Sequence, residues 1–555
     1  MVEADLMRLL NDVLAELTAR HADSPAVGDS GRVLTYRELA DAATAFGTAI
    51  DSWWRSDGAA NRAAEHGGRA RAGICAANSA GYVVAYAGLL RAGMVPFLLD
   101  PALGAHELAA VTADCGIDLY VSDRTLPPGL PGAVTTEIGG MRVTAMPARP
   151  PRPELLDTTE VCRFTSGSTG SPRCIEFSGA AVLGAALSWR EATGLGAGER
   201  VLCFAGLFNG LAFNTSLLAT FLAGASLWVP SGLPSSGHVV RFLREIEPTR
   251  LTGFPALYES LLRRDQSVPE LAGLRSALSS AAPLSPRTAA ELRRRHGLAV
   301  CDYYGVAEAG PLTYDPDPAP GRGLGYPLPG VEFAFGAPGH SDTSVRVRSR
   351  SMGSRYLNAA GLLESRLDAE GFYLTGDEGL IEDGRLVLRG RTGKGINIGG
   401  RKIDPVEVQE ALRRCGAADA LVLATVKKNG DPVLVALVDG VQGATERELR
   451  ARCLGLLAAH KVPERIFTVP RLPRGGAGKP RLGAAQALVA DLIQQHENDA
   501  LRERPGTHRA ERPTATPEAE PSFRHTTPPQ PNRGELDARI PAAPPAHRRT
   551  RRRSE

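Results

Sequence analysis

The stretch Phe164-Thr-Ser-Gly-Ser-Thr-Gly-Ser-Pro-Arg173 restricts the fold more than any other part of the sequence. Its hexapeptide 165–170 holds two glycines three residues apart and four hydroxyl side chains, and it follows a run at 160–164 that is typical of a β-strand. A loop so rich in backbone N–H and O–H donors is suited to surround a polyphosphate, and Arg173 adds the positive charge that such an anion needs. The alternative is a Ser/Gly-rich surface turn.

This loop is not a Walker A loop. That motif needs four residues between its glycines and then Lys followed by Ser or Thr, whereas here two residues separate Gly167 from Gly170 and the basic residue is Arg173. The sequence therefore disfavours a P-loop kinase or GTPase and leaves a different kind of polyphosphate site.

Length and composition exclude several classes of protein. A chain of 555 residues is too long for one core, so two or more domains are expected, and 43% hydrophobic with 23% charged residues is ordinary for a globular protein. A net charge of +3 says little about partners. No apolar run reaches 18 residues and the N-terminus has no signal-peptide pattern, so we expect no membrane span and no secretion. The eight cysteines form no C-x-x-C pair, which indicates free buried thiols in a cytoplasmic protein.

Strand-like runs alternate with helical patterns up to about residue 391, which predicts a large N-terminal α/β domain of layered sheets and helices over 1–391. A glycine-rich break at 390–395 precedes a smaller pattern with a helix at 405–414, strands at 420–426 and 433–438, and a helix at 446–460. We therefore expect a small α+β C-terminal domain over 392–495.

The last segment, 496–555, has a different composition. Residues 501–555 hold ten prolines, twelve arginines and seven acidic residues, and they have few aromatic or β-branched side chains. Such a segment buries too little apolar surface to offset its ordering entropy, so we expect a disordered tail. It is either a solvated extension or a weak docking arm for an acidic partner or nucleic acid.

Nine further motifs follow one order along the chain. Among them are Tyr303-Tyr-Gly-Val-Ala-Glu308, Thr375-Gly-Asp377 and Gly478-Lys479, and the others lie at 34–39, 91–101, 207–214, 281–284, 325–330 and 390–403. Together with the loop at 164–173, they resemble the motifs of the adenylate-forming superfamily, which includes acyl-CoA synthetases, aryl-CoA ligases, luciferases and peptide-synthetase adenylation domains. The resemblance covers about residues 10–490.

The resemblance implies ATP-dependent activation of a carboxylic acid. A carboxylate attacks the α-phosphate of ATP, pyrophosphate leaves, and positive charge is needed where the two anions meet. Glu308 is implied to hold Mg²⁺, which favours hard oxygen ligands. Lys479 is one of six lysines, all at position 394 or later, and it is implied to enter the site and bridge carboxylate and phosphate. Arg173 stands for the lysine that usually ends the phosphate loop.

Further residues are implied to contact the nucleotide. Asp377 would accept the ribose hydroxyls, Tyr304 would stack on adenine and Arg391 would reach ribose or phosphate. The full set implied to bind ATP or AMP is Thr165, Ser166, Gly167, Ser168, Thr169, Gly170, Ala281, Ala282, Pro283, Tyr303, Tyr304, Gly305, Asp377 and Arg391.

Other implied roles concern the acid, the hinge and the thiol. Asn209, Gly210 and Phe213 are implied to line the acid pocket, Gly393 and Lys394 to form a hinge on which a mobile small domain turns, and Gly399 and Gly400 to line the approach of the thiol. The sequence departs from the family pattern at Ala307 (usually Thr), at Asn209 (usually His) and at Gly393, where an acidic or basic residue is common.

The expected function is therefore an AMP-forming acid–thiol ligase that uses ATP, Mg²⁺ and coenzyme A. The segments 207–216 and 279–284 hold no ionisable side chain, so we expect an uncharged aryl or acyl tail and no α-amino acid. One alternative is a stand-alone adenylation enzyme that loads the phosphopantetheine of an acyl carrier protein. Another is a nucleotide- or acyl-binding homologue that has lost catalysis.

Overall fold

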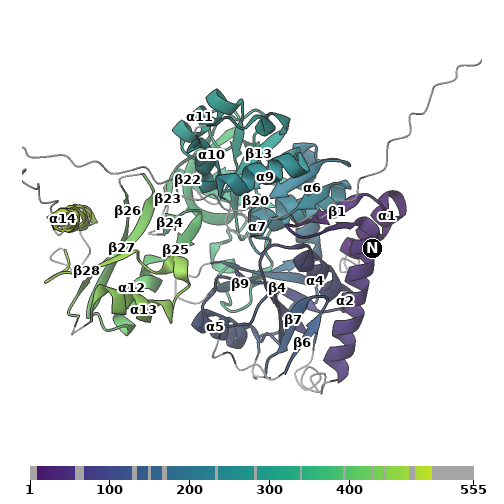
Figure 1. The fold of residues 1–555 in the computed structure, drawn as a ribbon, viewed down its shortest axis with the longest axis horizontal. Coiled ribbons are helices and arrows are strands. Elements are labelled where there is room, and N and C mark those ends of the chain that lie inside the picture. Colours follow the sequence, from purple (N-terminus) through teal and green to yellow (C-terminus); the bar gives the residue numbers. More distant parts are fainter. Residues whose placement is uncertain are drawn as a thin grey trace, which may run out of the picture. The chain divides into compact units, whose positions relative to one another are not determined.

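The computed structural model describes residues 9–56, 68–127, 130, 134–147, 152–165, 172–231, 235–264, 266–280, 284–337, 341–391, 395–427, 430–441, 444–473 and 482–502 (Figure 1). Met1–Gln495 form one compact unit and His496–Glu555 a second, of which only 496–502 are described, as the end of a helix. The rest of the expected tail, from 503, lies outside the described residues. No helix in the described ranges is long and apolar enough to cross a membrane.

One large sheet has eight strands and carries the phosphate-loop stretch. Its order is β21 (Arg355–Tyr356), β9 (Arg173–Ser178), β8 (Thr159–Thr165), β4 (Val95–Leu98), β3 (Arg71–Cys75), β5 (Leu119–Ser122), β7 (Met141–Ala145) and β6 (Val134–Ile138). The central strands β8, β4, β3 and β5 are parallel, and the outer pairs are antiparallel. Parallel strands need helical crossovers, and α4 (Ala80–Arg91) lies between β3 and β4 in sequence and α5 (Ala105–Cys115) between β4 and β5. Helix α2 (Tyr36–Ser56) precedes β3.

A second sheet of seven strands has the order β14 (Val300–Asp302), β13 (Ser276–Ser279), β12 (Arg250–Gly253), β10 (Arg200–Cys203), β11 (Ser226–Trp228), β1 (Pro25–Gly28) and β2 (Val33–Thr35). All neighbours are parallel except β1 and β2. The remaining helices of this region are α1 (Leu9–His21), α6 (Gly179–Thr193), α7 (Gly210–Ala212), the π-helical η2 (Phe213–Leu218), α8 (Ala219–Ala223), α9 (Ser236–Ile246), α10 (Pro255–Leu262), η3 (Pro269–Gly273) and α11 (Pro286–His296).

The largest hydrophobic core joins the two sheets. It contains Ile74 and Val161 from the first sheet, Val201 and Leu227 from the second, and the fully buried Phe213 of η2. The helix begun by α7 and continued by η2 and α8 is therefore buried between the layers, which explains why residues 211–221 are apolar or small almost without a break. The expected α/β domain of layered sheets is confirmed.

A third, antiparallel sheet consists of β19 (Val331–Phe335), β20 (Ser344–Ser349), β22 (Tyr373–Glu382) and β23 (Arg385–Arg391). It follows two short hairpins, β15 (Gly305–Val306) with β16 (Gly310–Pro311) and β17 (Thr313–Tyr314) with β18 (Tyr326–Pro327), and a 3₁₀ turn, η4 (Glu364–Arg366), precedes β22. This sheet brings the Thr-Gly-Asp motif of β22 toward the segment that follows β14.

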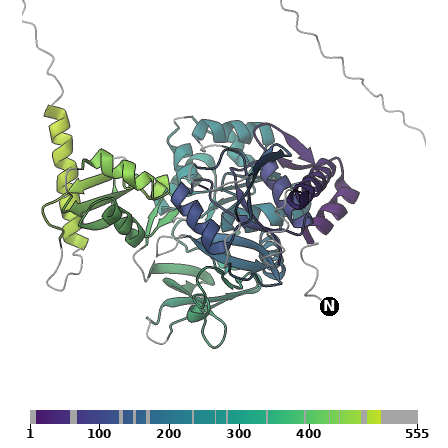
Figure 2. The same cartoon turned by 90° about the horizontal axis from the view of Figure 1, so that it is seen from below.

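The C-terminal elements pack around cores of their own and are grouped in Figure 2. They are β24 (Ile396–Ile398), β25 (Arg401–Ile403), α12 (Pro405–Arg414), β26 (Asp419–Val426), β27 (Pro432–Asp439), α13 (Glu446–Leu454), η5 (Ala459–Lys461), β28 (Arg465–Thr468) and α14 (Leu482–Arg502). The helix predicted at 405–414 is confirmed, since Asp404 accepts a hydrogen bond from Val406 N and Pro405 occupies the first turn.

Two expectations for this region need correction. The helix predicted at 446–460 ends at Leu454, and a separate 3₁₀ turn follows at Ala459–Lys461, because Gly455 interrupts the helix former pattern. Helix α14 continues to Arg502, beyond the expected start of the tail at 496. The eight cysteines are free and buried, as predicted.

Candidate active site

The expected site segments follow the carboxyl ends of parallel strands. The segments at 166–171, 204–209, 280–283 and 303–305 follow β8, β10, β13 and β14, each paired in parallel with a neighbour. In open α/β sheets this is where ligands bind. Several expected residues lie outside the described ones: Ser166, Gly167, Ser168, Thr169, Gly170, Ala281, Ala282, Pro283, Gly393, Lys394 and Lys479.

The phosphate loop joins the two strands of a hairpin. β8 and β9 are antiparallel with Thr165 opposite Arg173, and both residues are half-buried. Asn358 fixes the returning strand: its Nδ2 donates to Pro172 O at 2.9 Å, and its Oδ1 accepts from Cys174 N at 2.8 Å. The loop therefore begins and ends at neighbouring points. The sequence offered no signal for Asn358, which lies more than 180 residues beyond the loop.

Glu308 lies in the turn of the β15–β16 hairpin and is held by a tyrosine. Tyr356 Oη donates to Glu308 Oε1 at 2.5 Å, and Glu308 O accepts from Gly353 N at 2.7 Å. Burial raises the pKa of Tyr356, and the negative charge of Glu308 raises it further, so the phenol stays protonated and remains a donor. Arg355 beside it is anchored to the buried Glu176 of β9, with 2.6 Å between Nε and Oε1. The Glu308 carboxylate is thus fixed next to β9, the strand that carries Arg173.

The fit of Mg²⁺ to this site rests on Glu308. One of its oxygens accepts from a phenol, and its chemistry is that of a hard ligand. In the part of the chain that the structure describes, no three His, Cys, Asp or Glu side chains are grouped to hold a metal ion. A single carboxylate suits Mg²⁺, which usually keeps waters and takes other ligands from substrate phosphates.

Tyr304, Asp377 and Arg391 come together across two elements. Tyr304 Oη donates to Asp377 Oδ2 at 2.6 Å, and Asp377 N donates to Thr375 Oγ1 at 3.1 Å. Asp377 also pairs with Arg391 in the β22–β23 ladder. Tyr304 and Asp377 are buried, with 8% and 6% of their surface exposed. The Tyr304 ring and the Asp377 carboxylate are therefore held next to each other in a fixed orientation.

Tyr303 and Gly305, on either side of Tyr304, fix the path of this segment in different ways. The Tyr303 ring is buried edge-to-face against Trp189, with 5.7 Å between ring centres, and Tyr303 N donates to Ser279 O at 2.9 Å. A Cβ at Gly305 would come within 2.4 Å of Tyr303 Oη and 2.8 Å of Gly310 O, so only glycine fits. Both residues fix the path of the segment that delivers Tyr304 and Glu308.

The expected acid-pocket residues begin the buried helix between the sheets. Asn209 caps it, since its Oδ1 accepts from Leu211 N at 3.0 Å, and Phe213 packs edge-to-face on Tyr86 with 5.6 Å between ring centres. A Cβ on Gly210 would lie 3.0 Å from Nη1 of Arg163, a buried residue of β8. The sequence motifs did not include Arg163. A charged residue within the strand-like run 160–164 is the signal that could have identified it.

Gly399 and Gly400 form the turn between β24 and β25. Their φ angles are 58° and 84°, and two positive values in a two-residue hairpin turn are those of type I′, which favours glycine. Nη1 of Arg401, the next residue, lies 3.5 Å from Asp100 Oδ2 and donates to His460 Nδ1 at 2.8 Å.

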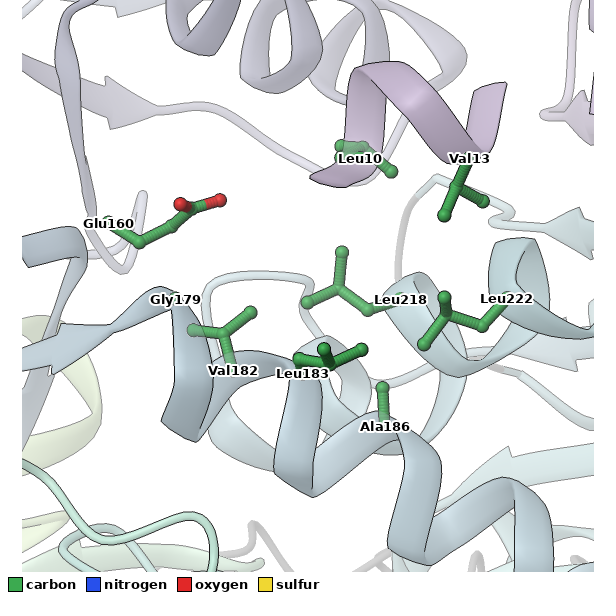
Figure 3. Close-up of a pocket in the computed structure, with 9 residues that line it drawn as sticks. All are labelled: Leu10, Val13, Glu160, Gly179, Val182, Leu183, Ala186, Leu218 and Leu222. Atoms are coloured by element: carbon green, nitrogen blue, oxygen red, sulfur yellow. The ribbon is translucent and has the colours of Figure 1, made fainter. Parts of the chain in front are cut away.

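A small cavity elsewhere has no room for an organic acid. It has a volume of about 20 Å³, and its lining is Leu10, Val13, Glu160, Gly179, Val182, Leu183, Ala186, Leu218 and Leu222 (Figure 3). The Glu160 carboxylate points toward the space among these apolar side chains. That volume is enough for about one water molecule, whereas ligand pockets need several hundred Å³.

Comparisons with known proteins place these features in context. Residues 14–335 match the family described as "AMP-binding enzyme". An anthranilate–CoA ligase of Pseudomonas aeruginosa is 27% identical over 447 residues, which are 73% of this chain and 84% of that protein. A malonyl-CoA ligase solved with methylmalonyl-CoA and AMP is 26% identical, has a TM-score of 0.69, and is matched over 82% of this chain and 97% of that one. An o-succinylbenzoate CoA synthetase of Bacillus subtilis shares the fold, with a TM-score of 0.71 at 22% identity over 84% and 96% of the chains.

Proposed function

The chain belongs to the AMP-binding enzyme family, and from that membership we propose how its residues perform the activity. It is an ATP-dependent carboxylate ligase that forms an acyl-adenylate and passes the acyl group to coenzyme A. The observation that carries this function is the match to a CoA ligase over 73% of the chain.

In the first step the acid's carboxylate oxygen attacks the α-phosphorus of ATP, and pyrophosphate leaves with the electron pair of the broken P–O bond. We assign the polyphosphate to the loop that joins Thr165 and Arg173, where loop N–H groups and the guanidinium neutralise negative charge. Asp377 accepts the ribose hydroxyls and the face of Tyr304 takes the adenine. The hydrogen bond between these two side chains supports a joint role, because it fixes the ring relative to the carboxylate.

Glu308 is assigned to Mg²⁺ through the oxygen chemistry described above. The ion supplies positive charge to the phosphate oxygens as charge develops on them. Tyr356 orients the carboxylate that would hold the ion, and its phenol keeps its proton as the hydrogen-bond donor. Lys479 is assigned to the junction of carboxylate and phosphate, where its ammonium completes the charge balance.

In the second step the thiol sulfur attacks the acyl carbonyl, AMP leaves, and the thiol proton passes to solvent. We propose that a large domain, 1–391, and a small domain, 392–495, turn relative to each other at Gly393 and Lys394 between the steps. Gly399 and Gly400 would then line the thiol's approach, and their left-handed turn keeps side chains out of that path. Buried free thiols are consistent with work in the cytoplasm, where ATP and coenzyme A are found.

The test is acid-dependent exchange of labelled pyrophosphate into ATP across a panel of aryl and acyl acids, followed by mass spectrometry of the thioester. We expect exchange with at least one acid and a coenzyme A thioester of the same acid. Transfer of the acyl group only to the phosphopantetheine of a carrier protein would show that this protein, and not coenzyme A, is the acceptor. ATP binding without exchange for any acid would identify a homologue that has lost catalysis.

A further inference from the structure

Arg163 is a buried cation in the layer where the acid pocket is expected. It lies on β8, two residues before Thr165, and only 6% of its surface is exposed. Its side chain projects into the core between the two large sheets, because its guanidinium carbon lies 3.9 Å from the ring centre of Phe177 and 5.4 Å from that of Phe213. The guanidinium is therefore held between aromatic rings at a fixed depth.

Two of the three guanidinium nitrogens have no acceptor in the part of the chain that the structure describes. Nε and Nη1 of Arg163 are buried and have no hydrogen-bond partner among the described residues. Other buried arginines of this chain do have oxygen partners: Arg250 bonds to Glu199, Arg385 to Asp315, and Arg71 to two backbone carbonyls. Arg163 thus differs from these three buried arginines, each of which donates to an oxygen acceptor.

Such an arrangement is costly unless an anion completes it. A buried charge without a paired group is strongly unfavourable, and cation–π contacts recover only part of the loss. Burial lowers the pKa of Arg163 to about 10, so the side chain is still charged at neutral pH. The fork of N–H groups matches a carboxylate or sulfonate, which can accept two parallel hydrogen bonds.

The free face of the guanidinium adjoins the expected acid pocket. An added Cβ on Gly210 would lie 3.0 Å from Nη1 and 3.9 Å from Asn214 Nδ2, so the guanidinium lies directly against Gly210, one of the residues expected to line the pocket. The negative charge of Glu308 opposes the effect of burial on the pKa of Arg163 and favours its charged form. No ion pair within 4.0 Å joins Arg163 to an acidic residue in the described ranges.

We propose that Arg163 binds a second acidic group of the substrate, so that the acid activated by this enzyme is a dicarboxylic or sulfonated carboxylic acid. This rests on the proposed function and differs from the expectation of an uncharged tail, which was drawn from segments 207–216 and 279–284 and did not include β8. The reacting carboxylate is a poorer partner for this cation, because adenylation turns it into the uncharged acyl group of a mixed carboxylic–phosphoric anhydride and would leave Arg163 unpaired for the second step. A second acidic group keeps its charge through both steps.

The test compares matched acids in pyrophosphate exchange: benzoic acid against phthalic, isophthalic, terephthalic and sulfobenzoic acids, and hexanoic against adipic acid. We expect kcat/KM to favour a member with the second acidic group by at least about tenfold. Arg163→Met, which keeps length and loses charge, should reverse that preference while it retains exchange with the neutral acids. Arg163→Lys should keep part of it. An equal loss for neutral and acidic members in Arg163→Met would assign the residue a packing role and overturn the proposal.

A second measurement separates this proposal from the proposed function. Each acid is added to the unmodified protein and to Arg163→Met, and the melting temperature is recorded. Stabilisation by the doubly acidic members that Arg163→Met abolishes supports the subsite even if no acid supports exchange, in which case only the ligase function fails. Exchange that favours neutral acids keeps the function and overturns the subsite. The absence of both the preference and the stabilisation also overturns it.

Discussion

Tyr304 Oη lies 2.6 Å from Oδ2 of Asp377 and donates a hydrogen bond to it, although 73 residues separate them in the chain. Tyr304 follows β14 of the second large sheet, and Asp377 belongs to β22 of the third sheet. The bond therefore ties the expected adenine contact to the expected ribose contact. Each of these side chains is already oriented before a nucleotide enters.

This relationship predicts the effect of Tyr304→Phe. The ring stays, and the hydrogen bond that orients Oδ2 of Asp377 for the ribose is lost. Because hydrogen bonds to charged groups contribute about 1.5–3 kcal/mol, we expect KM for ATP to rise about tenfold, with a smaller change in kcat. Pyrophosphate exchange at varied ATP measures both. The matched control is Tyr120→Phe, which removes a buried phenol bonded to Thr112 at 2.8 Å away from the site; an equal rise of KM there would contradict the assignment.

Glu308→Gln should change the response to magnesium. The variant keeps the shape and loses the charge that would hold Mg²⁺, so we expect kcat to fall roughly 100-fold and the half-saturating Mg²⁺ concentration to rise. Tyr356→Phe removes only the bond to Glu308 and should give a smaller shift in the same direction. A magnesium titration of the adenylation rate distinguishes the two. An unchanged titration curve in Glu308→Gln would remove this residue from the metal site.

Lys479→Ala tests the glycine-flanked lysine, which lies outside the described residues. Since its charge is needed mainly where carboxylate and phosphate meet, the loss should fall on kcat, roughly 100-fold, with ATP binding almost unchanged. Single-turnover adenylate formation is the measurement. Lys427→Ala, at an exposed lysine paired with Glu464, is the control and should keep the normal rate. Normal single-turnover adenylation in Lys479→Ala would exclude the role.

Glu160 should make stability depend on pH. Burial raises its pKa from 4.5 to about 7, opposed by Arg69. The contribution of Glu160 to the free energy of unfolding is therefore complete below about pH 4.5 and is lost as the pH rises through 7. The loss amounts to about 3 kcal/mol. Glu160→Gln stays neutral, so its melting temperature should fall less than that of the unmodified protein between pH 5 and 8. Asp302, whose pKa is also raised to about 7, affects both proteins equally. Parallel plots of melting temperature against pH for the two proteins would show that Glu160 is already ionised in the folded state.

Lys461 should be worth more to stability than an exposed lysine. Its Nζ lies 2.7 Å from Glu107 Oε1 and 2.7 Å from Glu407 Oε1, and all three side chains are at most 4% exposed. Lys461→Met leaves two carboxylates buried together, at a cost of about 3–5 kcal/mol. Lys427→Ala should cost below about 1 kcal/mol. Thermal unfolding measures both, and Glu107→Gln with Glu407→Gln should recover most of the loss in Lys461→Met. Equal melting temperatures for the two lysine variants would contradict the buried network.

Local sequence determined the parts of the fold that carry their own signals. The strand that precedes the phosphate loop and the helix at 405–414 with its Asp-Pro start could be predicted, because caps and periodicity act within a few residues. The antiparallel return strand β9 was not predicted. The helix at 446–460 was predicted too long, since the weak effect of Gly455 was outweighed by the surrounding pattern. Asn209 was expected in the pocket, and its capping bond to Leu211 emerged only with the helix itself.

Tertiary structure alone decided which distant side chains meet. Asn358 at the phosphate hairpin, Tyr356 at Glu308, and Glu107 at Lys461 have partners 48 to 354 residues away. Likewise, only the packing of β8 against the helix that starts at Gly210 shows that Nε and Nη1 of Arg163 have no acceptor among the described residues. The physical reason is that the sequence fixes the hydrogen-bonding capacity and charge of each side chain, while the packing of three sheets and their helices decides whether that capacity is met by a neighbour or left for a ligand.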